Sequence, residues 1–367
     1  MINMGINFMT IVNNSKLPIT KPLLPLFEAI TNSFQSIWEA NIQDGFITIK
    51  VIRTSSSTKK KSWESDVESF EIEDNGIGFN EKNFKSFITY GSDHKLELGC
   101  KGIGRVIWLK AFSNVYIEST YQSEDGRYFD RDFEFKRSGE INVIRNEPSN
   151  RNKLVSKVLL ERYAKKFKSN CPKLLETLAR EIMNHFFTIL ALDTPLKITI
   201  FDDEQIIIVN DFFKECIKNS QQIKEFYIKG ELFQIIHTKN YVATTENHLI
   251  HYCAHKREVL SDKLSKNILN NLPGKISNEI GDFIYNGYVI SEYLDEIVSS
   301  DRTGFDFSTN NPVVNGDTEY NQMEFDGSDS SDTINFKVID KEIIPIIEEY
   351  LQDEIKIFHE GKGKKGF

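Results

Sequence analysis

Two glycine-rich stretches and an acidic strand end carry the residues whose types and spacing could do chemistry. Residues 71–79 read Glu-Ile-Glu-Asp-Asn-Gly-Ile-Gly-Phe, and residues 99–105 read Gly-Cys-Lys-Gly-Ile-Gly-Arg. A carboxylate at a strand end can accept a hydrogen bond from the exocyclic amine of adenine, and glycines let backbone amides approach a ligand closely. Together these stretches predict a nucleotide-binding site.

A polar stripe on an upstream helix adds a candidate base and a candidate metal ligand. Its residues are spaced by four, three and four positions: Glu28, Asn32, Gln35 and Glu39. Residues at this spacing share one side of a helix. A carboxylate one turn before a carboxamide can polarise a water while the amide oxygen holds a hard cation. On an isolated helix the same stripe would be a solvated surface, so its interpretation depends on the glycine stretches.

Each glycine stretch also has an ordinary interpretation. Asp74-Asn-Gly76-Ile-Gly78 is a common turn sequence, and a lone glycine-rich loop is a weak signal. The second stretch, however, directly precedes an apolar segment, 105–112, that we expect to be helical, and amides at a helix start can seat a phosphate. Neither the Walker pattern nor a dinucleotide-binding GxGxxG after a first strand is present. The common P-loop enzymes are therefore excluded.

A helix and several strands must position these residues. Apolar residues at helical spacing predict a helix over 22–40, with Pro22 and Pro25 near its start. The other elements expected in this first unit are strands over 46–52, 67–73, 115–121, 128–135 and 196–201, and a long helical region over roughly 156–190.

A second unit is expected from about residue 206. Its predicted elements are a helix over 211–219 and strands around 225–236, 248–254 and 282–290. Residues 313–335 are rich in Asp, Asn, Ser and Gly, which predicts a flexible acidic segment. A last amphipathic helix is expected over 340–358. The predicted divisions are 1–205, 206–312, 313–335 and 336–367.

Composition limits the class of protein. A chain of 367 residues is long enough for two domains. Its net charge of −9 argues against a chain-wide electrostatic grip on nucleic acid, although it leaves room for a local basic patch. The four cysteines form no CxxC pair, and no apolar run approaches the roughly 20 residues that span a bilayer. We therefore expect a cytoplasmic protein with no membrane partner.

The order of the three motifs resembles that of the GHKL ATPases, which include gyrase, the ninety-kilodalton heat-shock chaperones, histidine kinases and MutL. Glu28-x-x-x-Asn32 is similar to their first box, Asp74-x-Gly76-x-Gly78 to their second, and Gly99-x-Lys101-Gly102-x-Gly104 to their third. The resemblance covers about residues 15–310, and its layout is most similar to MutL, MORC and chaperone-type ATPases.

This resemblance implies an α+β fold: a Bergerat-type α/β sandwich, in which a mixed sheet carries helices on one face, followed by a smaller α/β transducer-like domain. It implies ATP and Mg²⁺ as cofactors, with Glu28 as general base, Asn32 as metal ligand and Asp74 as the reader of adenine. The remaining implied cofactor-binding residues are Gly76, Gly78, Ser92, Lys95, Gly99, Lys101, Gly102, Ile103, Gly104 and Arg105. Residues 79–101 would form a mobile lid.

The chain departs from the family pattern at two places. Gln35 replaces an aspartate of the first box, which puts one water-mediated contact near the metal or base in doubt. The family's later strand threonine has no clear counterpart; residues 152–155 occupy roughly that place, and we assign no adenine contact there. In the second unit Arg302 ends a segment that is similar to the chaperones' middle domain. It would act as a catalytic contact to the γ-phosphate, or else as a surface arginine paired with Asp301 or Asp306.

One further cluster of ligand-type residues invites a zinc interpretation: His248, His251, Cys253 and His255. They lie in an expected strand, where alternation sends His248 to one side and the other three to the opposite side. Close ligand pairs and a second half-site are missing. We interpret these residues as structural.

The sequence thus predicts an Mg²⁺-dependent ATP hydrolase of the GHKL class. Lid closure and nucleotide-dependent homodimerisation would drive a conformational switch that acts on an unknown protein partner. The family also suggests DNA as a partner, in DNA-related or anti-foreign-DNA defence processes, which the acidic composition does not favour. The alternative is a non-hydrolysing, ATP-gated module that presents a surface to its partner.

Overall fold

The chain divides into two compact units, residues 1–185 with 194–212 and residues 186–193 with 213–367. The structure is a computed structural model, and the residues that it describes are 8–54, 65–89, 104–191, 195–243, 246–264, 274–299, 304–307 and 334–363. Each unit is a mixed α+β unit with a sheet of its own. Among the helices of these residues, none combines the length and the apolar character that a bilayer crossing requires.

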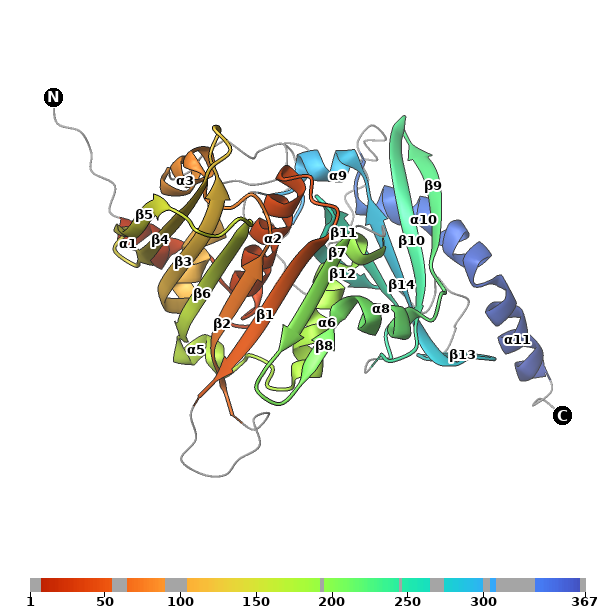
Figure 1. Cartoon of the computed structure of the whole chain (residues 1–367). Helices are drawn as coiled ribbons and strands as arrows, with labels where there is room; N and C mark the ends of the chain where they lie inside the picture. Colours follow the sequence, from red (N-terminus) through yellow and green to blue (C-terminus); the bar gives the residue numbers. More distant parts are fainter. Residues whose placement is uncertain are drawn as a thin grey trace. The chain divides into compact units, whose positions relative to one another are not determined.

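The first unit is built on an eight-stranded mixed sheet in the order β5-β4-β3-β6-β2-β1-β7-β8 (Figure 1). The strands are β1 (Gly45–Arg53), β2 (Val67–Asp74), β3 (Phe112–Gln122), β4 (Tyr128–Lys136), β5 (Ile141–Pro148), β6 (Val155–Tyr163), β7 (Leu196–Phe201) and β8 (Ile206–Ile208). Strands β1 and β7 run parallel, and the other neighbours run antiparallel. Buried and half-buried residues alternate along β1, so one face of the sheet is fully covered.

The helices of this unit are α1 (Phe8–Asn14), α2 (Leu24–Glu39), α3 (Glu81–Ile88), α4 (Gly104–Ala111), α5 (Lys165–Lys168) and α6 (Leu175–His185). Of these, α2, α4 and α6 contact strands of the sheet. The central one is α2, which packs against β1, β2 and α4. Its position confirms the helix predicted over 22–40. Gln35, expected on the polar stripe, is buried, and Trp38, expected on the apolar face, is exposed. These two expectations were wrong because α2 packs against both the sheet and α4. The side of the helix that is buried therefore differs from the side that the apolar residues indicate.

The long helix expected over 156–190 is also wrong in its first part. Residues Val155–Tyr163 form β6, which pairs with β2 on one side and β3 on the other. Ser156, Val158 and Leu160 are buried alternately with half-buried residues, which is the period of a strand. Helical structure starts only at α5, and α6 then confirms the later part of the expected region.

The second unit contains a six-stranded sheet in the order β12-β11-β14-β10-β9, with β13 paired to β14 (Figure 1). Its strands are β9 (Gln222–Ile228), β10 (Glu231–Asn240), β11 (Leu249–Ala254), β12 (Arg257–Lys263), β13 (Ile276–Asn278) and β14 (Gly281–Ile290). Its helices are α7 (Phe187–Ala191), α9 (Glu292–Ile297), α10 (Phe336–Tyr350) and α11 (Gln352–Gly363), and α8 (Val209–Ile217) spans the division between the units.

Two elements of this unit differ from expectation. The strand expected around 225–236 is a hairpin, which turns at Lys229 and Gly230, both with positive φ. The helix expected over 340–358 is two helices that meet at Leu351. Residues of α10 spaced by four, Ile339, Ile343 and Ile347, are fully buried against this unit's core. The expected acidic segment lies almost wholly in residues 308–333, outside the described residues.

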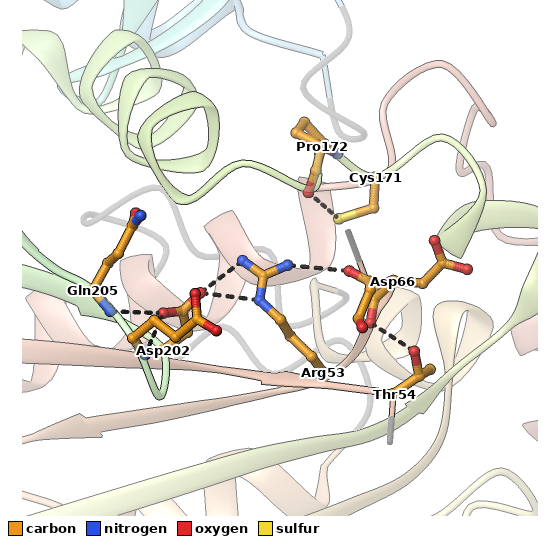
Figure 2. A network of polar contacts seen from close by, with 9 residues as sticks. Arg53, Thr54, Asp66, Cys171, Pro172, Asp202 and Gln205 are labelled. Carbon is orange, nitrogen blue, oxygen red and sulfur yellow. Dashed lines mark hydrogen bonds and ion pairs between the residues drawn. The ribbon is translucent and has the colours of Figure 1, made fainter. Parts of the chain in front are cut away.

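A buried ion pair joins the end of β1 to the turn between β7 and β8 (Figure 2). Arg53 donates from Nη2 (2.8 Å) and Nε (3.0 Å) to Asp202 Oδ2, and the two side chains are 7% and 2% exposed. Asp202 Oδ1 accepts the N–H groups of Glu204 (3.0 Å) and Gln205 (2.9 Å). Burial by itself raises the pKa of Asp202. The backbone donors and Arg53 lower it by more, so the pKa lies below its ordinary value.

We predict that Asp202→Ala lowers the free energy of unfolding by about 3 kcal/mol, because it leaves a buried guanidinium without its partner. The folded-state pKa of Asp202 lies below the unfolded value of about 3.9. The contribution of the carboxylate is therefore present at neutral pH and is lost as the pH falls through the folded pKa. Denaturant titrations should show a constant difference in unfolding free energy between wild type and variant from about pH 7 to about pH 5, and a shrinking difference as the pH falls below about 4.

The matched control for this measurement is Asp203→Ala, which changes an exposed carboxylate of the same turn. It should cost less than about 0.5 kcal/mol, as surface substitutions usually do. A gap for Asp202→Ala that stays constant with pH would contradict the assigned pKa direction.

Candidate nucleotide-binding site

One side of α2 lies against the Asp74–Gly78 turn at one end and against the start of α4 at the other. Glu28, Asn32 and Ser36 are spaced by four, so they share a side of the helix, and they span about 12 Å along its axis. Gly104, the first residue of α4, lies against Glu28: a β-carbon built on it would lie 3.0 Å from the Glu28 carboxyl carbon and closer to one carboxylate oxygen. Gly76 lies against Ser36 at the other end of this side. Asn32 falls between them.

The turn after β2 is hydrogen-bonded to α2. Asp74, the last residue of β2, is 3% exposed, and its Oδ1 accepts the N–H of Gly76 at 2.8 Å. Ile77 donates its N–H to the Ser36 carbonyl (3.0 Å), and Gly78 donates to the Ser36 hydroxyl (3.2 Å). The acidic strand end and its glycine turn are thereby held against the helix that carries the candidate base.

Two buried serines lie beside Asp74 on neighbouring strands. The register places Ser156 of β6 opposite Asp74, and Ser119 of β3 opposite Ser156. All three are buried, and the serine hydroxyl oxygens are 2.9 Å apart. Gly78 (φ +73°) approaches this pair so closely that a β-carbon on it would lie 2.6 Å from Ser119 Oγ and 3.1 Å from Ser156 Oγ. The turn therefore needs glycine here for its conformation and for space.

Neither serine is among the site residues that the sequence motifs predict. The helix expected over 156–190 would begin at residue 156, and residues 152–155, in roughly the place of the strand threonine of the GHKL pattern, carry no expected adenine contact. The pairing of β6 with β2 instead puts Ser156 next to Asp74. Buried positions alternate along 155–163 in the folded chain, but its sequence, Val-Ser-Lys-Val-Leu-Leu-Glu-Arg-Tyr, does not alternate apolar and polar residues, so it gave no strand signal.

Several predicted site residues lie outside the described residues, namely Ser92, Lys95, Gly99, Lys101, Gly102, Ile103 and Arg302. The described residues on either side of each of these undescribed stretches contact each other. Arg105 Nη2 donates to the Thr89 carbonyl at 2.8 Å, and Ser299 donates its N–H to the Gly304 carbonyl at 2.9 Å.

Arg105 and the start of the expected lid contact the protein core. The Arg105 guanidinium lies 5.2 Å from the centroid of the Phe87 ring. Within the expected lid, 79–101, residues Glu81–Ile88 form α3, whose Phe84 and Phe87 rings lie 5.1 Å and 5.3 Å from Phe133 of β4. The described part of that segment is thus a packed helix, and its remainder lies outside the described residues.

The histidines of the second unit bond to protein groups. His248 Nδ1 accepts the N–H of Tyr285 at 2.9 Å, and His251 Nδ1 lies 2.9 Å from a Glu258 carboxylate oxygen. No group of three or more His, Cys, Asp or Glu side chains suited to a metal occurs in the part of the chain that the structure describes. These contacts agree with a structural role for both histidines.

The sequence matches no protein-family model, and no curated protein matches it. The site is therefore interpreted from its geometry. Two carboxylates lie at the two ends of one side of α2. Asp74 lies at the end near Ser36, and Glu28 lies at the other end, beside the first residue of α4.

We predict that Gly76→Ala and Gly104→Ala differ in stability. A β-carbon at Gly76 would lie 2.5 Å from the Ser36 carbonyl carbon and 2.6 Å from the Ile37 nitrogen, which are backbone atoms of α2. Gly76→Ala should therefore lower the free energy of unfolding by about 2 kcal/mol or more. Gly104→Ala meets only the end of the Glu28 side chain, which can rotate away, and should cost less than about 1 kcal/mol. Denaturant unfolding measures both, and a larger loss for Gly104→Ala would contradict these contacts.

Proposed function

We propose that the chain binds ATP with Mg²⁺ and hydrolyses ATP, as a GHKL-class ATPase with a Bergerat-type sandwich in its first unit and a transducer-like second unit. The observation that carries the proposal is the arrangement along α2. Glu28 lies against Gly104 at one end, the Asp74–Gly78 turn lies against Ser36 at the other, and Asn32 falls between them. The mixed sheet with α2 packed against it also supports the proposal. Lid closure and nucleotide-dependent homodimerisation belong to it through the family resemblance.

The proposed roles follow from the chemistry of each side chain. The Asp74 carboxylate accepts a hydrogen bond from the exocyclic amine of adenine and rejects the keto oxygen of guanine, because two acceptors would then face each other. The amide oxygen of Asn32 is a ligand for Mg²⁺, which when bound neutralises phosphate charge. Glu28 takes the proton of the attacking water. Its carboxylate lies beside the start of α4.

A non-hydrolysing, ATP-gated binding module is the second candidate function. Gln35 favours it, because a buried carboxamide stands where the family resemblance places an aspartate, and an amide cannot supply negative charge beside the catalytic base. Steady-state phosphate release by the wild-type chain decides between the two functions. Measurable ATP affinity without phosphate release above background would support the binding module.

We predict that Glu28→Gln retains ATP binding and loses hydrolysis. The amide preserves the shape of the side chain against Gly104 but cannot take up a proton. Phosphate release should fall by roughly 100-fold or more, while the Kd for a non-hydrolysable ATP analogue changes by less than about 3-fold. Glu176→Gln, which alters an exposed carboxylate of α6, should leave both quantities unchanged. Equal turnover in Glu28→Gln and wild type would remove Glu28 from the role of base.

We also predict that Asp74→Asn weakens ATP binding itself. The amide oxygen of the variant can still accept the N–H of Gly76, so the turn is preserved. The new NH₂ group, however, presents a donor to the adenine amine. The Kd for ATP should rise by about 10-fold or more, which corresponds to losing one hydrogen bond to a charged group. Isothermal titration of this variant, with the exposed Asp203→Asn as control, measures the effect. An unchanged Kd would contradict the adenine contact.

A further inference from the structure

Arg131 of β4 extends the row of buried polar residues that begins at Asp74. The register places Arg131 opposite Ser119, so the row runs Asp74, Ser156, Ser119, Arg131 across β2, β6, β3 and β4. Residues directly opposed in antiparallel strands project from the same face of the sheet. The Arg131 side chain is 3% exposed. A guanidinium is therefore buried on the face that carries Asp74.

This guanidinium holds the chain directly after the second glycine of the turn. Arg131 Nη1 donates to the carbonyl oxygen of Phe79 at 2.8 Å, and the N–H of Phe79 donates to Ser119 Oγ at 3.0 Å. Both peptide groups of Phe79 are thus fixed to neighbouring residues of the row. The Gly78 carbonyl also accepts a hydrogen bond, from Asn83 Nδ2 at 3.1 Å. Each N–H from Gly76 to Phe79 has an acceptor, so the whole turn is held.

The surroundings of Arg131 show what an arginine adds at this position. The guanidinium carbon lies 4.5 Å from the centroid of the Phe84 ring and 4.8 Å from that of Tyr121, and Nη2 donates to the Tyr121 hydroxyl at 3.0 Å. Its ion-pair partner, Glu81, has a side chain that is 79% exposed. An apolar side chain would pack between the same rings without the cost of burying a charge. Only a donor can hold the Phe79 carbonyl.

We propose that Arg131 is a positioning residue for base selection. By holding the Phe79 peptide, it fixes the Gly76–Gly78 turn beside Asp74 and so determines how strictly the site prefers adenine to guanine. The inference rests on the proposed function, since it assumes that Asp74 reads the base. It assigns Arg131 no contact with the nucleotide.

The test compares ATP and GTP, which share a triphosphate and differ only in the base. Arg131→Met should lower the ratio of GTP to ATP Kd values by about 10-fold or more, because a looser turn no longer enforces the mismatch at the keto oxygen. Tyr121→Phe keeps the ring but removes one acceptor of the guanidinium, and should lower the ratio by about 3-fold. If Arg131 had a purely structural role, the variant would contain less folded protein and would bind both nucleotides more weakly by the same factor. The ratio of the GTP Kd to the ATP Kd would then be unchanged.

Arg145→Met is the matched control. Arg145 of β5 bonds to Asp132 (2.7 Å) and Asp130 (3.2 Å), which alternate with Arg131 along β4 and so lie on the opposite face of the sheet. This variant loses an arginine of the neighbouring strand together with its ion pairs to β4, yet should keep the wild-type ratio. Tyr121→Phe also serves as the second test if Arg131→Met does not fold.

The outcomes separate the inference from the proposed function. Wild-type preference for ATP together with an unchanged ratio in Arg131→Met and Tyr121→Phe overturns the inference and leaves the proposed function standing. An equal fall of the ratio in Arg145→Met also overturns it. A wild-type chain that binds neither nucleotide overturns both.

Discussion

The approach of a helix to backbone that has no side chain is the constraint on which the site depends. At Gly76 a β-carbon would meet the main chain of α2 itself, so the turn after β2 can reach the helix only through a glycine. That approach lets the Ser36 carbonyl and hydroxyl accept the N–H groups of Ile77 and Gly78. Strand end, turn and helix therefore form one hydrogen-bonded unit. The positions of Glu28 and Asn32 relative to Asp74 then follow from the geometry of α2 alone.

Two buried arginines secure opposite ends of the same sheet, in different ways. Arg53 pairs with a buried carboxylate, Asp202, and so ties β1 to the turn between β7 and β8 (Figure 2). Arg131 is buried between aromatic rings, and its carboxylate partner is exposed, so its bond to the Phe79 carbonyl is the contact that fixes backbone. Burying a charge costs free energy unless its hydrogen bonds are made. In both cases those bonds hold a turn in place.

The second unit shows that ligand-type residues near one another in sequence need not share a site. His248, His251 and His255 lie in or next to β11, yet each ring lies near a different group: the Tyr285 N–H, the Glu258 carboxylate and, at 3.7 Å, the Asp295 carboxylate. Strand alternation and the turn after β11 send these residues in different directions. Strand pairing has the opposite effect in the first unit. It places Asp74, Ser156 and Ser119, which are far apart in sequence, next to one another in the sheet.

The sequence by itself determined α2, α4 and the strands β1, β2 and β7, because apolar periodicity and helix or turn punctuation are local properties of the chain. It also determined the residues of the three motifs. The tertiary structure alone decided that 155–163 is a strand, that Gln35 is buried, and that Ser119, Ser156 and Arg131 lie in one row with Asp74. The physical reason is that strand register depends on pairing between distant segments. The sequence of β6 is compatible with a helix when taken alone. It becomes a strand because β2 and β3, on its two sides, pair with its backbone N–H and carbonyl groups.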